Sequence, residues 1–402
     1  MYTLLRRKLA GLKGEVVDFA CDLVQTPSPT LGEGEVAEKV ERRLAELEYD
    51  KVVHDDLGNV VGIMFGRESE PNVLLVSHMD TVSASTESAW SSPPESAAIR
   101  DGRIYGLGTA DCKGGVAAQA YAGALLKRSL LPLRGNLIFA ATVAEGNGRS
   151  VGVRGLIERT LPELGIKPTF AILGEPTGLG LYYGHDGWVE LELEVEGVNP
   201  FHVDDVAKAI VSSCSGGAGA AETLSVSEPS YEDRGGARRA TIMMNRRLFE
   251  SEIVGSVVDR VRREAIQASS ASDTAVNVRV REGRERLYNG RYELVKNVAN
   301  GWAIDPYDRL VERSRQALSA AGISVHPRKW ELGRLGMGTA GGTLVKEFGI
   351  STVGYGPGLE EAAHRVDEFV EIDKLVEAVY GTAAIVHSLI GIPVFGWTSD
   401  EP

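Results

Sequence analysis

The chain has 402 residues, of which 43% are hydrophobic and 25% charged, with 56 Asp and Glu against 43 Lys and Arg. This composition is typical of a globular protein with room for two or three domains. The formal net charge of −13 and the lack of a basic run argue against a nucleic acid or an anionic membrane surface as partner.

Two further features of the sequence concern its compartment. No apolar window approaches the length of a membrane span, and the charged residues 6–8 indicate an amphipathic N-terminal helix instead of a signal peptide. The three cysteines are too few and too scattered for a disulfide framework. We therefore expect a cytoplasmic protein that keeps its thiols reduced.

Continuously apolar runs are typical of strands covered on both faces, and they lie at 73–76, 137–143, 170–173 and 352–355. Helical stretches lie between these runs, for example at 115–126 and 151–161. This alternation predicts an α/β fold with a mixed, mostly parallel sheet flanked by helices.

The middle of the chain has a different pattern. Residues 189–196 and 276–281 alternate between apolar and polar side chains, as strands with one solvent-facing side do. If these strands were neighbours, the Glu row of the first and the Arg row of the second could pair. Helical segments near 203–212 and 252–267 would cover the apolar side.

We therefore predict an inserted α+β domain at 187–302, within a larger domain formed by 1–186 and 303–402. The Gly, Ser and Ala-rich segment 213–230 is expected to be a loop or a loosely packed helix end. The tail after Ile392 is expected to be frayed.

Possible metal ligands follow the ends of the apolar strands. His78 and Asp80 lie two apart on an extended chain, so their side chains project to the same side, and Asp80 can orient the ring of His78 toward a metal. Side chains that follow the carboxyl ends of strands in an α/β sheet meet at one edge. The other residues expected there are Asp111 from a glycine-rich turn, Glu145, Glu175 and His364. This donor set suits zinc, with cobalt or manganese as weaker fits.

At these residues the chain resembles the zinc amidohydrolases that include acetylornithine deacetylase, succinyl-diaminopimelate desuccinylase, aminoacylase and carboxypeptidase G. Five motifs carry the resemblance in order along nearly the whole chain. They read SHMDTV at 77–82, YGLG leading to DCKGG at 105–115, GEPT at 174–177, GYGPG at 354–358, and AH followed by DE at 363–368. The resemblance implies a zinc peptidase-like fold with an inserted ferredoxin-like lid that forms a homodimer.

The resemblance also implies a role for each metal-site residue. His78 and Glu175 would bind a first zinc ion, Asp111 would bridge two ions, and His364 would bind the second. Asp80 would orient His78.

For catalysis, the resemblance implies that Glu145 is the general base that takes a proton from the activated water and passes it to the leaving amine. Arg247 would hold a substrate carboxylate, and His202 would reach the active site of the partner subunit. His202 stands five residues after Gly197, where the family spacing is four. The substrate would be a small molecule with an amide bond, either an N-acyl amino acid or a small peptide.

The chain departs from the family pattern at the base, where an acidic residue and two glutamates are expected and the sequence reads Ala144-Glu145-Gly146. One alignment makes Glu145 the base and puts Gly146 in place of a glutamate that binds the second metal. A shifted alignment makes Glu145 the ligand and leaves no base. Ala340 also stands where the family commonly has an aspartate.

Two kinds of function follow from these observations. The first is a metal-dependent hydrolase that uses one or two zinc ions per chain to cleave an amide bond. The alternative is a protein of the same shape with an impaired second metal site near Gly146, acting as a one-metal enzyme or as a non-catalytic binding protein. Cys112 is expected to pack, and structural roles are expected for the other histidines, His54, His185, His326 and His387.

Overall fold

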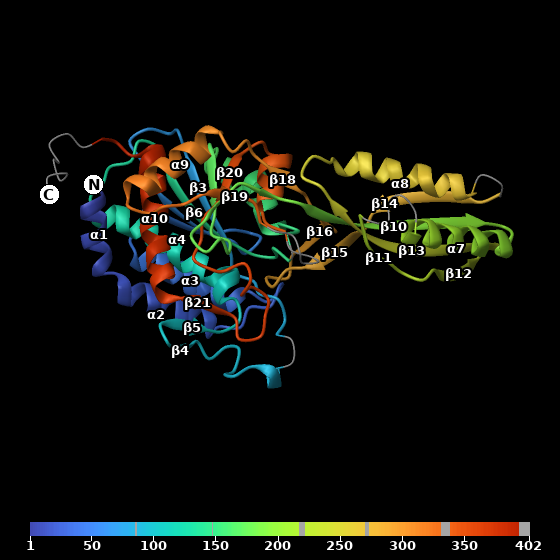
Figure 1. The fold of residues 1–402 in the computed structure, drawn as a ribbon, viewed down its shortest axis with the longest axis horizontal. Helices are drawn as coiled ribbons and strands as arrows, with labels where there is room; N and C mark the ends of the chain where they lie inside the picture. The colour runs from blue at the N-terminus through green and yellow to red at the C-terminus, as the bar shows by residue number, and fades with distance from the viewer. Residues whose placement is uncertain (85–86, 147, 217–221, 270–272, 331–337, 394–402) are drawn as a thin grey trace.

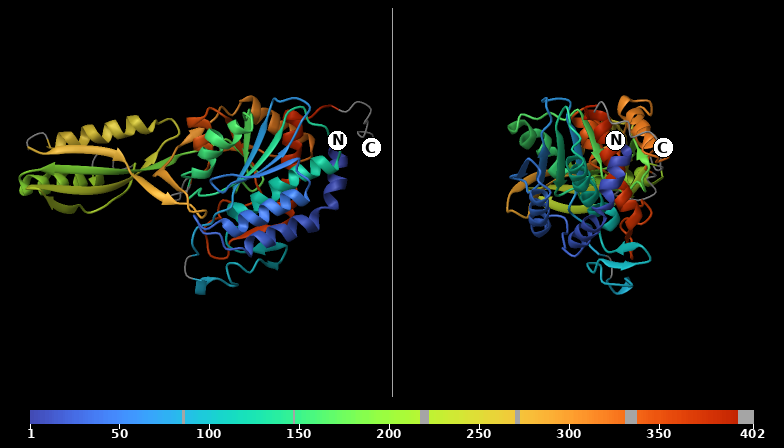
Figure 2. Two further views of the ribbon diagram at one scale, coloured as in Figure 1. Left: turned by 180° about the vertical axis from the view of Figure 1, so that it is seen from behind. Right: turned by 90° about the vertical axis from the view of Figure 1, so that its left-hand side faces the viewer.

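The computed structural model describes residues 1–84, 87–146, 148–216, 222–269, 273–330 and 338–393. The molecule is elongated, with a broad α/β unit that contains both chain ends and a slender unit that extends from it (Figure 1). The view from behind in Figure 2 shows the same separation.

The α/β unit is built on an eight-stranded mixed sheet with the order β1-β2-β6-β3-β7-β20-β8-β19. The central strands β6, β3, β7 and β20 run parallel to one another, as the apolar runs predict. The strands are β1 (Lys51–His54), β2 (Val60–Met64), β3 (Val73–His78), β6 (Leu137–Thr142), β7 (Phe170–Leu173), β8 (Leu181–Tyr182), β19 (Pro327–Arg328) and β20 (Ser351–Gly354). Every residue of β3 and β6 is buried, because helices cover both faces of the sheet.

The helices divide between two apolar clusters, one on each face of the sheet. The larger cluster joins the sheet to α1 (Tyr2–Ala10), α2 (Lys13–Val24), α3 (Gly34–Glu46), α4 (Gly114–Arg128), α9 (Arg309–Ala320) and α10 (Ile372–Ile390). The other face packs on a broken helical stretch formed by α5 (Val151–Gly155), η3 (Leu156–Thr160) and α6 (Leu161–Glu163). The predicted helices at 115–126 and 151–161 are therefore present.

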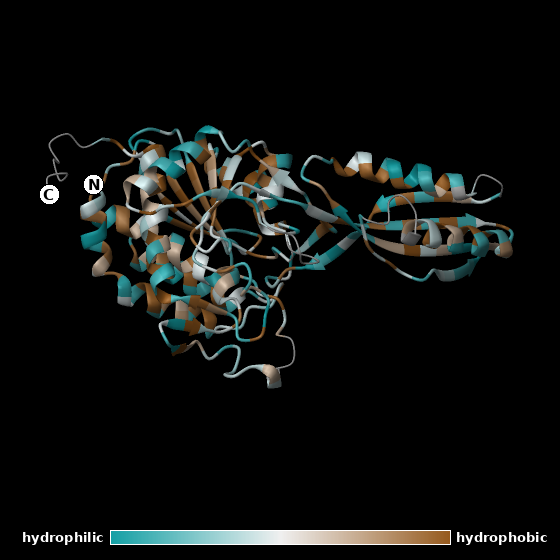
Figure 3. Cartoon of the chain, in the orientation of Figure 1, coloured by the Kyte–Doolittle hydropathy of each residue, from teal (hydrophilic) through white to brown (hydrophobic). Residues whose placement is uncertain are grey.

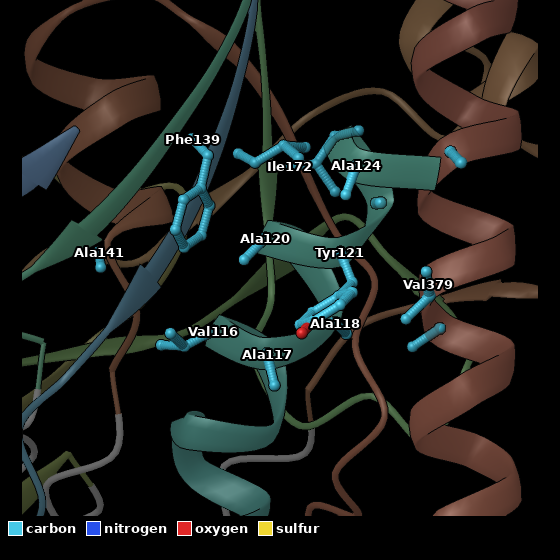
Figure 4. Packing of buried hydrophobic residues seen from close by; sticks show 14 of the residues in the cluster. Val116, Ala117, Ala118, Ala120, Tyr121, Ala124, Phe139, Ala141, Ile172 and Val379 are labelled. Atoms are coloured by element: carbon cyan, nitrogen blue, oxygen red, sulfur yellow. The ribbon is translucent and has the colours of Figure 1, made fainter. Parts of the chain in front are cut away.

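Helix α4 links this packing to the functional site. Its residues from Gly114 to Leu126 are all buried, and many are Ala or Gly, which lets other elements approach closely. Figure 4 shows Phe139 and Ile172 of the sheet on one side of α4 and Val379 of α10 on the other. Because α4 begins directly after the irregular turn η2 (Thr109–Lys113), its packing fixes the position of that turn.

The slender unit has an antiparallel sheet in the order β11-β13-β10-β14. Its elements are β10 (Gly187–Gly197), α7 (Pro200–Gly216), β11 (Thr223–Val226), β12 (Ser230–Arg234), β13 (Ala237–Leu248), α8 (Val254–Ser269), β14 (Ala275–Val280) and β17 (Val298–Ala299). Both helices cover one side of the sheet, where the apolar residues of β10 are buried (Figure 3). The order and the two covering helices confirm the expected ferredoxin-like arrangement.

The predicted pairing of β10 with β14 is also confirmed, because Glu192 lies opposite Arg279 in the register. Arg279 Nη2 donates to Glu192 Oε1 at 2.6 Å, and Arg281 Nη1 donates to Glu190 Oε1 at 2.9 Å. These pairs lie on the side of the sheet that faces away from the helices.

Some elements differ from the sequence-based expectation. Within 213–230, helix α7 continues to Gly216, strand β11 follows, and β12 begins at Ser230, while 217–221 lie outside the described residues. Most of the tail after Ile392 lies outside them as well. Among the described helices, none combines the length and the apolar character that a bilayer crossing requires.

Short strands complete the structure. They are β4 (Ala98–Arg100), β5 (Arg103–Tyr105) and β21 (Phe369–Glu371) in one small sheet, β9 (Gly184–His185) with β18 (Trp302–Ala303), and the hairpin of β15 (Glu282–Arg286) and β16 (Tyr292–Lys296). Two single-turn elements, η1 (Glu87–Ala89) and η4 (Thr343–Glu347), lie in connections. The hairpin was not predicted, and its Leu287 and Val295 pack into the larger cluster of the α/β unit.

Candidate metal centre

The polar residues expected at the sheet edge come from four separate segments. His78 is the last residue of β3, and Glu175 comes two residues after β7. Asp111 lies in the turn η2, and His364 lies between β20 and β21. Because β3 and β7 are parallel neighbours, their carboxyl ends deliver His78 and Glu175 to the same edge.

Three of these side chains converge in the buried interior. His78 Nε2 lies 3.3 Å from Asp111 Oδ1 and 4.0 Å from Glu175 Oε2. Together with Cys112, these residues offer donor atoms that all lie within 4.8 Å of one another. A tetrahedral ion with bonds of about 2.0–2.2 Å separates its ligand atoms by roughly 3.3–3.6 Å. The spacing of His78, Asp111 and Glu175 therefore fits one divalent cation.

The ring of His78 is oriented by Asp80. Its Nδ1 lies 2.8 Å from the backbone carbonyl oxygen of Asp80 and 3.4 Å from Asp80 Oδ1, two acceptors that place the ring proton on Nδ1. The lone pair is then on Nε2, which faces Asp111 and Glu175. The Asp80 carboxylate also accepts hydrogen bonds from Thr30 Oγ1 at 2.8 Å and from the backbone N–H of Glu145 at 3.1 Å.

The turn that carries Asp111 is held by a buried carboxylate, Glu368. Its oxygens accept hydrogen bonds from the backbone N–H groups of Gly108 at 3.0 Å, Ala110 at 2.8 Å and Asp111 at 3.0 Å. Gly108 has a φ of +80°, a conformation that glycine adopts without strain. The glycine-rich motif and the Asp-Glu motif, far apart in sequence, thus form one structure beneath the candidate ligand.

The charges of the cluster also suit a divalent cation. Burial acts first, and the negative charge of Asp111 acts with it, to raise the pKa of Glu175 well above its usual range. Although burial opposes ionisation of Asp111 too, hydrogen bonds from His364 and His78 hold its pKa well below the usual range. Two neighbouring buried carboxylates cannot both ionise cheaply without a positive partner, which a divalent ion would provide.

Glu145 lies beside this cluster with one carboxylate oxygen free. Ser150 Oγ donates to Glu145 Oε1 at 2.9 Å, whereas Oε2 is buried without a hydrogen-bond partner among the described residues. Burial raises the pKa of Glu145 to about 7. The residue lines a cavity of about 250 Å³ together with His78, Asp111 and His364. A carboxylate with a free oxygen and a pKa near neutrality is suited to proton transfer.

The position beside His364 offers fewer donors. His364 Nε2 lies 2.7 Å from Asp111 Oδ2, which is a hydrogen-bond distance and shorter than the spacing of two ligands on one ion. Gly146 has no side chain to contribute. Its φ is +45°, and a Cβ atom there would lie 2.6 Å from Arg149 Nη2. The guanidinium of Arg149 therefore occupies the space in which a glutamate side chain would begin.

The two residues predicted to contact substrate lie elsewhere. Arg247 forms two hydrogen bonds to Asp186 Oδ2, at 2.9 and 2.5 Å. His202 is paired with Asp273 at 2.6 Å and its side chain is 48% exposed. Strand β10 extends about 30 Å between the α/β unit and the start of α7, the helix that contains His202. His202 is therefore remote from the metal cluster of its own chain.

The sequence did not predict two features of this region, the places of Cys112 and Arg149, whereas a structural role was expected for His185. Cys112, expected only to pack, has its Sγ among the clustered donor atoms, and its thiol lies 3.6 Å from the carbonyl oxygen of Gly174. Arg149 lines the cavity, and nothing in its sequence surroundings distinguishes it from a surface arginine. His185 is buried against Trp302 and Trp330 at the junction of the units. Only the adjacency of Cys112 to Asp111 was a usable signal.

The sequence pattern of peptidase family M20/M25/M40 matches residues 74–388, which is most of the chain and includes every candidate ligand. The chain belongs to this family. Membership confirms the family resemblance seen in the motifs, and the matched region includes the buried His, Asp and Glu cluster.

Individual relatives align with only part of this chain. The chain is 32% identical to a succinyl-diaminopimelate desuccinylase of Stenotrophomonas maltophilia over 189 residues, covering 46% of this chain and 50% of that protein. It is 29% identical to YgeY of Escherichia coli K12 over 198 residues, covering 49% and 48%. The chain thus spans about half the length of the curated relatives it matches.

Solved structures support the M20 fold over a larger share of the chain. The YXEP protein of Bacillus subtilis, described as a dinuclear metal-binding peptidase of the M20 family, superposes with a TM-score of 0.69. That match covers 94% of this chain and 98% of the other at 15% identity. At this identity the similarity establishes the fold alone.

Proposed function

We propose that this protein is a metal-dependent hydrolase that cleaves the amide bond of an N-acyl amino acid or a small peptide. The observation that carries the proposal is the free, buried Oε2 of Glu145 beside the convergent donors of His78, Asp111 and Glu175. In this scheme the three donors hold one divalent cation, with zinc the preferred ion and cobalt or manganese as alternatives.

The proposed roles follow from what each side chain contacts. A bound cation supplies Lewis acidity, which lowers the pKa of a coordinated water and polarises a carbonyl group. Glu145 accepts a proton from the attacking water at Oε2 and delivers it to the nitrogen of the leaving amine. Ser150 keeps the Glu145 carboxylate in place through Oε1, and Asp80 holds both the ring of His78 and the backbone of Glu145.

We further propose one tightly bound metal ion per chain. A second ion would have only Asp111 and His364 as side-chain ligands, because residue 146 is glycine. Catalytic zinc sites typically use three protein ligands. The proximity of the Arg149 guanidinium to Gly146 adds a positive charge where a second carboxylate would be needed.

Metal analysis and a substrate screen test this function together. Purified protein, treated with chelator and then reloaded, is expected to bind one equivalent of zinc and to hydrolyse at least one acetylated amino acid or dipeptide. The Glu145→Ala variant should keep the metal and lose turnover, whereas Glu158→Ala, an exposed glutamate nearby, should behave as the parent. Failure to bind zinc, cobalt or manganese, or turnover unaffected by Glu145→Ala, would contradict the proposal.

A non-catalytic binding protein is the second candidate. It is favoured by the loss of polar groups at Gly146 and at Ala340, whose side chain is buried in the apolar cluster with Trp302. This candidate predicts that acyl amino acids bind to the metal-loaded protein without being cleaved. Calorimetric binding in the absence of turnover, across the whole screen, would support it over the enzyme.

We also propose a domain division for the chain and a homodimeric assembly. Residues 187–302 would form the inserted domain, and two chains would form a homodimer through the surface of this domain. Val198 and Phe201, 74% and 78% exposed, lie just before and at the start of α7, and β14 forms one edge of the sheet. Exposed apolar side chains beside a sheet edge are suited to pairing with another chain.

Light scattering of the parent protein and of Phe201→Asp tests the homodimer. We expect a dimer mass for the parent at micromolar concentration and a monomer mass for the variant. A monomeric parent would contradict the homodimer. We also propose that His202 acts in the partner's active site and that the protein is cytoplasmic.

A further inference from the structure

Arg149 is the residue of the active-site cavity that the proposed mechanism does not use. The residues that line this cavity of about 250 Å³ include one Arg and no Lys within the described part of the chain. The remaining titratable groups around it are His78, Asp80, Asp111, Glu145 and His364. Arg149 is therefore the only permanent positive charge that the described chain presents to this space.

The guanidinium is held in the cavity by its own loop. Arg149 Nε donates to the backbone carbonyl oxygen of Gly146 at 3.0 Å. The glycine is required for this arrangement, since a Cβ atom at residue 146 would lie 2.6 Å from Nη2 and 3.0 Å from Nε. The absence of a side chain at residue 146 and the placement of Arg149 are thus one structural feature.

The outer part of the guanidinium is paired with a carboxylate from the hairpin β15–β16. Arg149 Nη1 donates to Glu285 Oε1 at 2.5 Å, and the two side chains are 22% and 23% exposed. Arg149 lines the cavity, and both side chains of the pair are within reach of solvent. A carboxylate already occupies one face of Arg149, which shows that the guanidinium can accept an anion in this position.

We infer that Arg149 is a specificity-determining residue that binds a carboxylate of the substrate, which takes the place of Glu285. This inference rests on the proposed function, since it names the class of amide substrate: one that carries a carboxylate. A planar guanidinium binds a carboxylate through two parallel hydrogen bonds, so an analogue with an amide in place of the carboxylate would lose one of them and the negative charge that strengthens both.

Arg149 is a further candidate for the role that the sequence predicts for Arg247. The Arg247 guanidinium makes two hydrogen bonds to Asp186 and is not among the residues that line the cavity. Arg149 makes one hydrogen bond to Glu285 and lines the cavity directly. When a substrate carboxylate replaces the carboxylate of Glu285, the guanidinium keeps one negatively charged partner.

The carboxylate could belong to the amino acid or to the acyl group, and three probes separate these sources. N-Acetyl-alanine carries only the amino-acid carboxylate, N-succinyl-alanine amide carries only the acyl carboxylate, and N-acetyl-alanine amide carries neither. Binding of each to zinc-loaded protein is measured by calorimetry in a Glu145→Gln background, in which turnover does not interfere.

We expect at least one carboxylate probe to bind, and Arg149→Gln to weaken its binding by roughly 10- to 100-fold. Arg159→Gln is the matched control, because Arg159 pairs with another carboxylate of the hairpin, Glu293, and does not line the cavity. It should leave binding unchanged. Glu285→Gln, which removes the competing carboxylate, should tighten binding of the same probe several-fold.

Two results would overturn the inference: no carboxylate probe binds, or Arg149→Gln weakens binding no more than Arg159→Gln does. The test does not depend on hydrolysis. If carboxylate probes bind through Arg149 and the parent protein hydrolyses no compound of the substrate screen, the enzyme proposal fails and the Arg149 assignment stands. If the parent protein hydrolyses a compound of the screen and Arg149→Gln binds every probe as the parent does, the enzyme proposal stands and the Arg149 assignment fails.

Discussion

The backbone N–H of Glu145 donates a hydrogen bond of 3.1 Å to Asp80 Oδ1. Asp80 also contacts the ring of His78, at 2.8 Å through its backbone carbonyl oxygen. One residue therefore supports both a candidate metal ligand and the loop that carries the candidate base. The two proposed functions of the site, metal binding and proton transfer, share this support.

Replacement of Asp80 by Ala should weaken both functions together. Loss of a residue that orients a ligand histidine typically costs about 10- to 100-fold in metal affinity or activity. We expect a loss of that size in zinc affinity, measured by competition with a chelating dye, and a similar loss in kcat/KM. Thr30→Ala, which removes a single hydrogen bond to Asp80 Oδ2, is the milder control. Unchanged zinc affinity in Asp80→Ala would argue against a supporting role.

The space beside Gly146 leads to a prediction on metal stoichiometry. Gly146→Glu alone should not create a second site, because its Cβ would meet the Arg149 guanidinium and its φ of +45° is unfavourable for a side chain. The combination with Arg149→Ala removes the contact with the guanidinium, leaves only the cost of the backbone conformation, and should raise the zinc content from one to two equivalents. Arg149→Ala alone should stay at one. Two equivalents in the unmodified protein would show that a second ion needs no ligand from residue 146.

Stability should depend on pH through His185, which is buried at the junction of the two units. Its Nε2 accepts a hydrogen bond from the backbone N–H of Thr339 at 3.0 Å, and burial lowers the pKa of the ring to about 4. The unfolded chain, with a pKa near 6.5, takes up the proton first as the pH falls. Stabilisation is therefore complete above about pH 6.5 and is lost between there and about pH 4, by about 3 kcal/mol.

Urea unfolding at a series of pH values measures this loss. His185→Asn, which does not titrate, should show a shallower fall in the free energy of unfolding between pH 6.5 and 4. The difference between the two curves isolates His185 from the carboxylates that titrate in the same range. Parallel curves for the parent and the variant would mean that the ring takes up a proton in the folded state at its ordinary pKa.

Much of the fold was predictable because its signals are local. The buried strands at 73–76 and 137–143 are apolar throughout, and β10 alternates with a strict period of two. Strand β13 was missed although its burial alternates as well, because ARRATIMMNRRL has arginines on both faces, with Arg246 on the buried one, and so gives a weak apolar signal. The hairpin β15–β16 was missed because much of its surface is charged and its apolar contacts are with the distant α/β unit.

Some residues of the candidate site could likewise be predicted from the sequence, and others could not. The candidate ligands His78, Asp111, Glu175 and His364 could be named because each stands in a motif at a strand end or turn. The position of Arg149 could not be predicted, since it depends on the absence of a side chain at Gly146 and on Glu285, more than a hundred residues away. The pairing of Arg247 with Asp186 could not be foreseen either, because only the folded junction brings them together.

The hairpin β15–β16 should anchor the slender unit through Tyr288, at its tip. The Tyr288 hydroxyl lies 3.2 Å from the carbonyl oxygen of Gly58 and 2.6 Å from His54 Nε2. A Cβ atom at Gly58 would lie 2.4 Å from the Tyr288 ring, and the φ of Gly58 is +101°. Tyr288→Ala should lower the free energy of unfolding by about 2 kcal/mol, because the ring is half-buried.

A double-mutant cycle separates ring contact from backbone strain at this anchor. Gly58→Ala alone should destabilise the protein by more than the roughly 1 kcal/mol expected for alanine at a positive φ, because its methyl group also displaces the Tyr288 ring. In the Tyr288→Ala background the ring is gone, so Gly58→Ala should cost only the backbone part. The cost of the two changes together should therefore be smaller than the sum of the single costs, as measured by urea unfolding. Additive costs would place the Tyr288 ring away from Gly58 in solution and would remove the basis for the anchor.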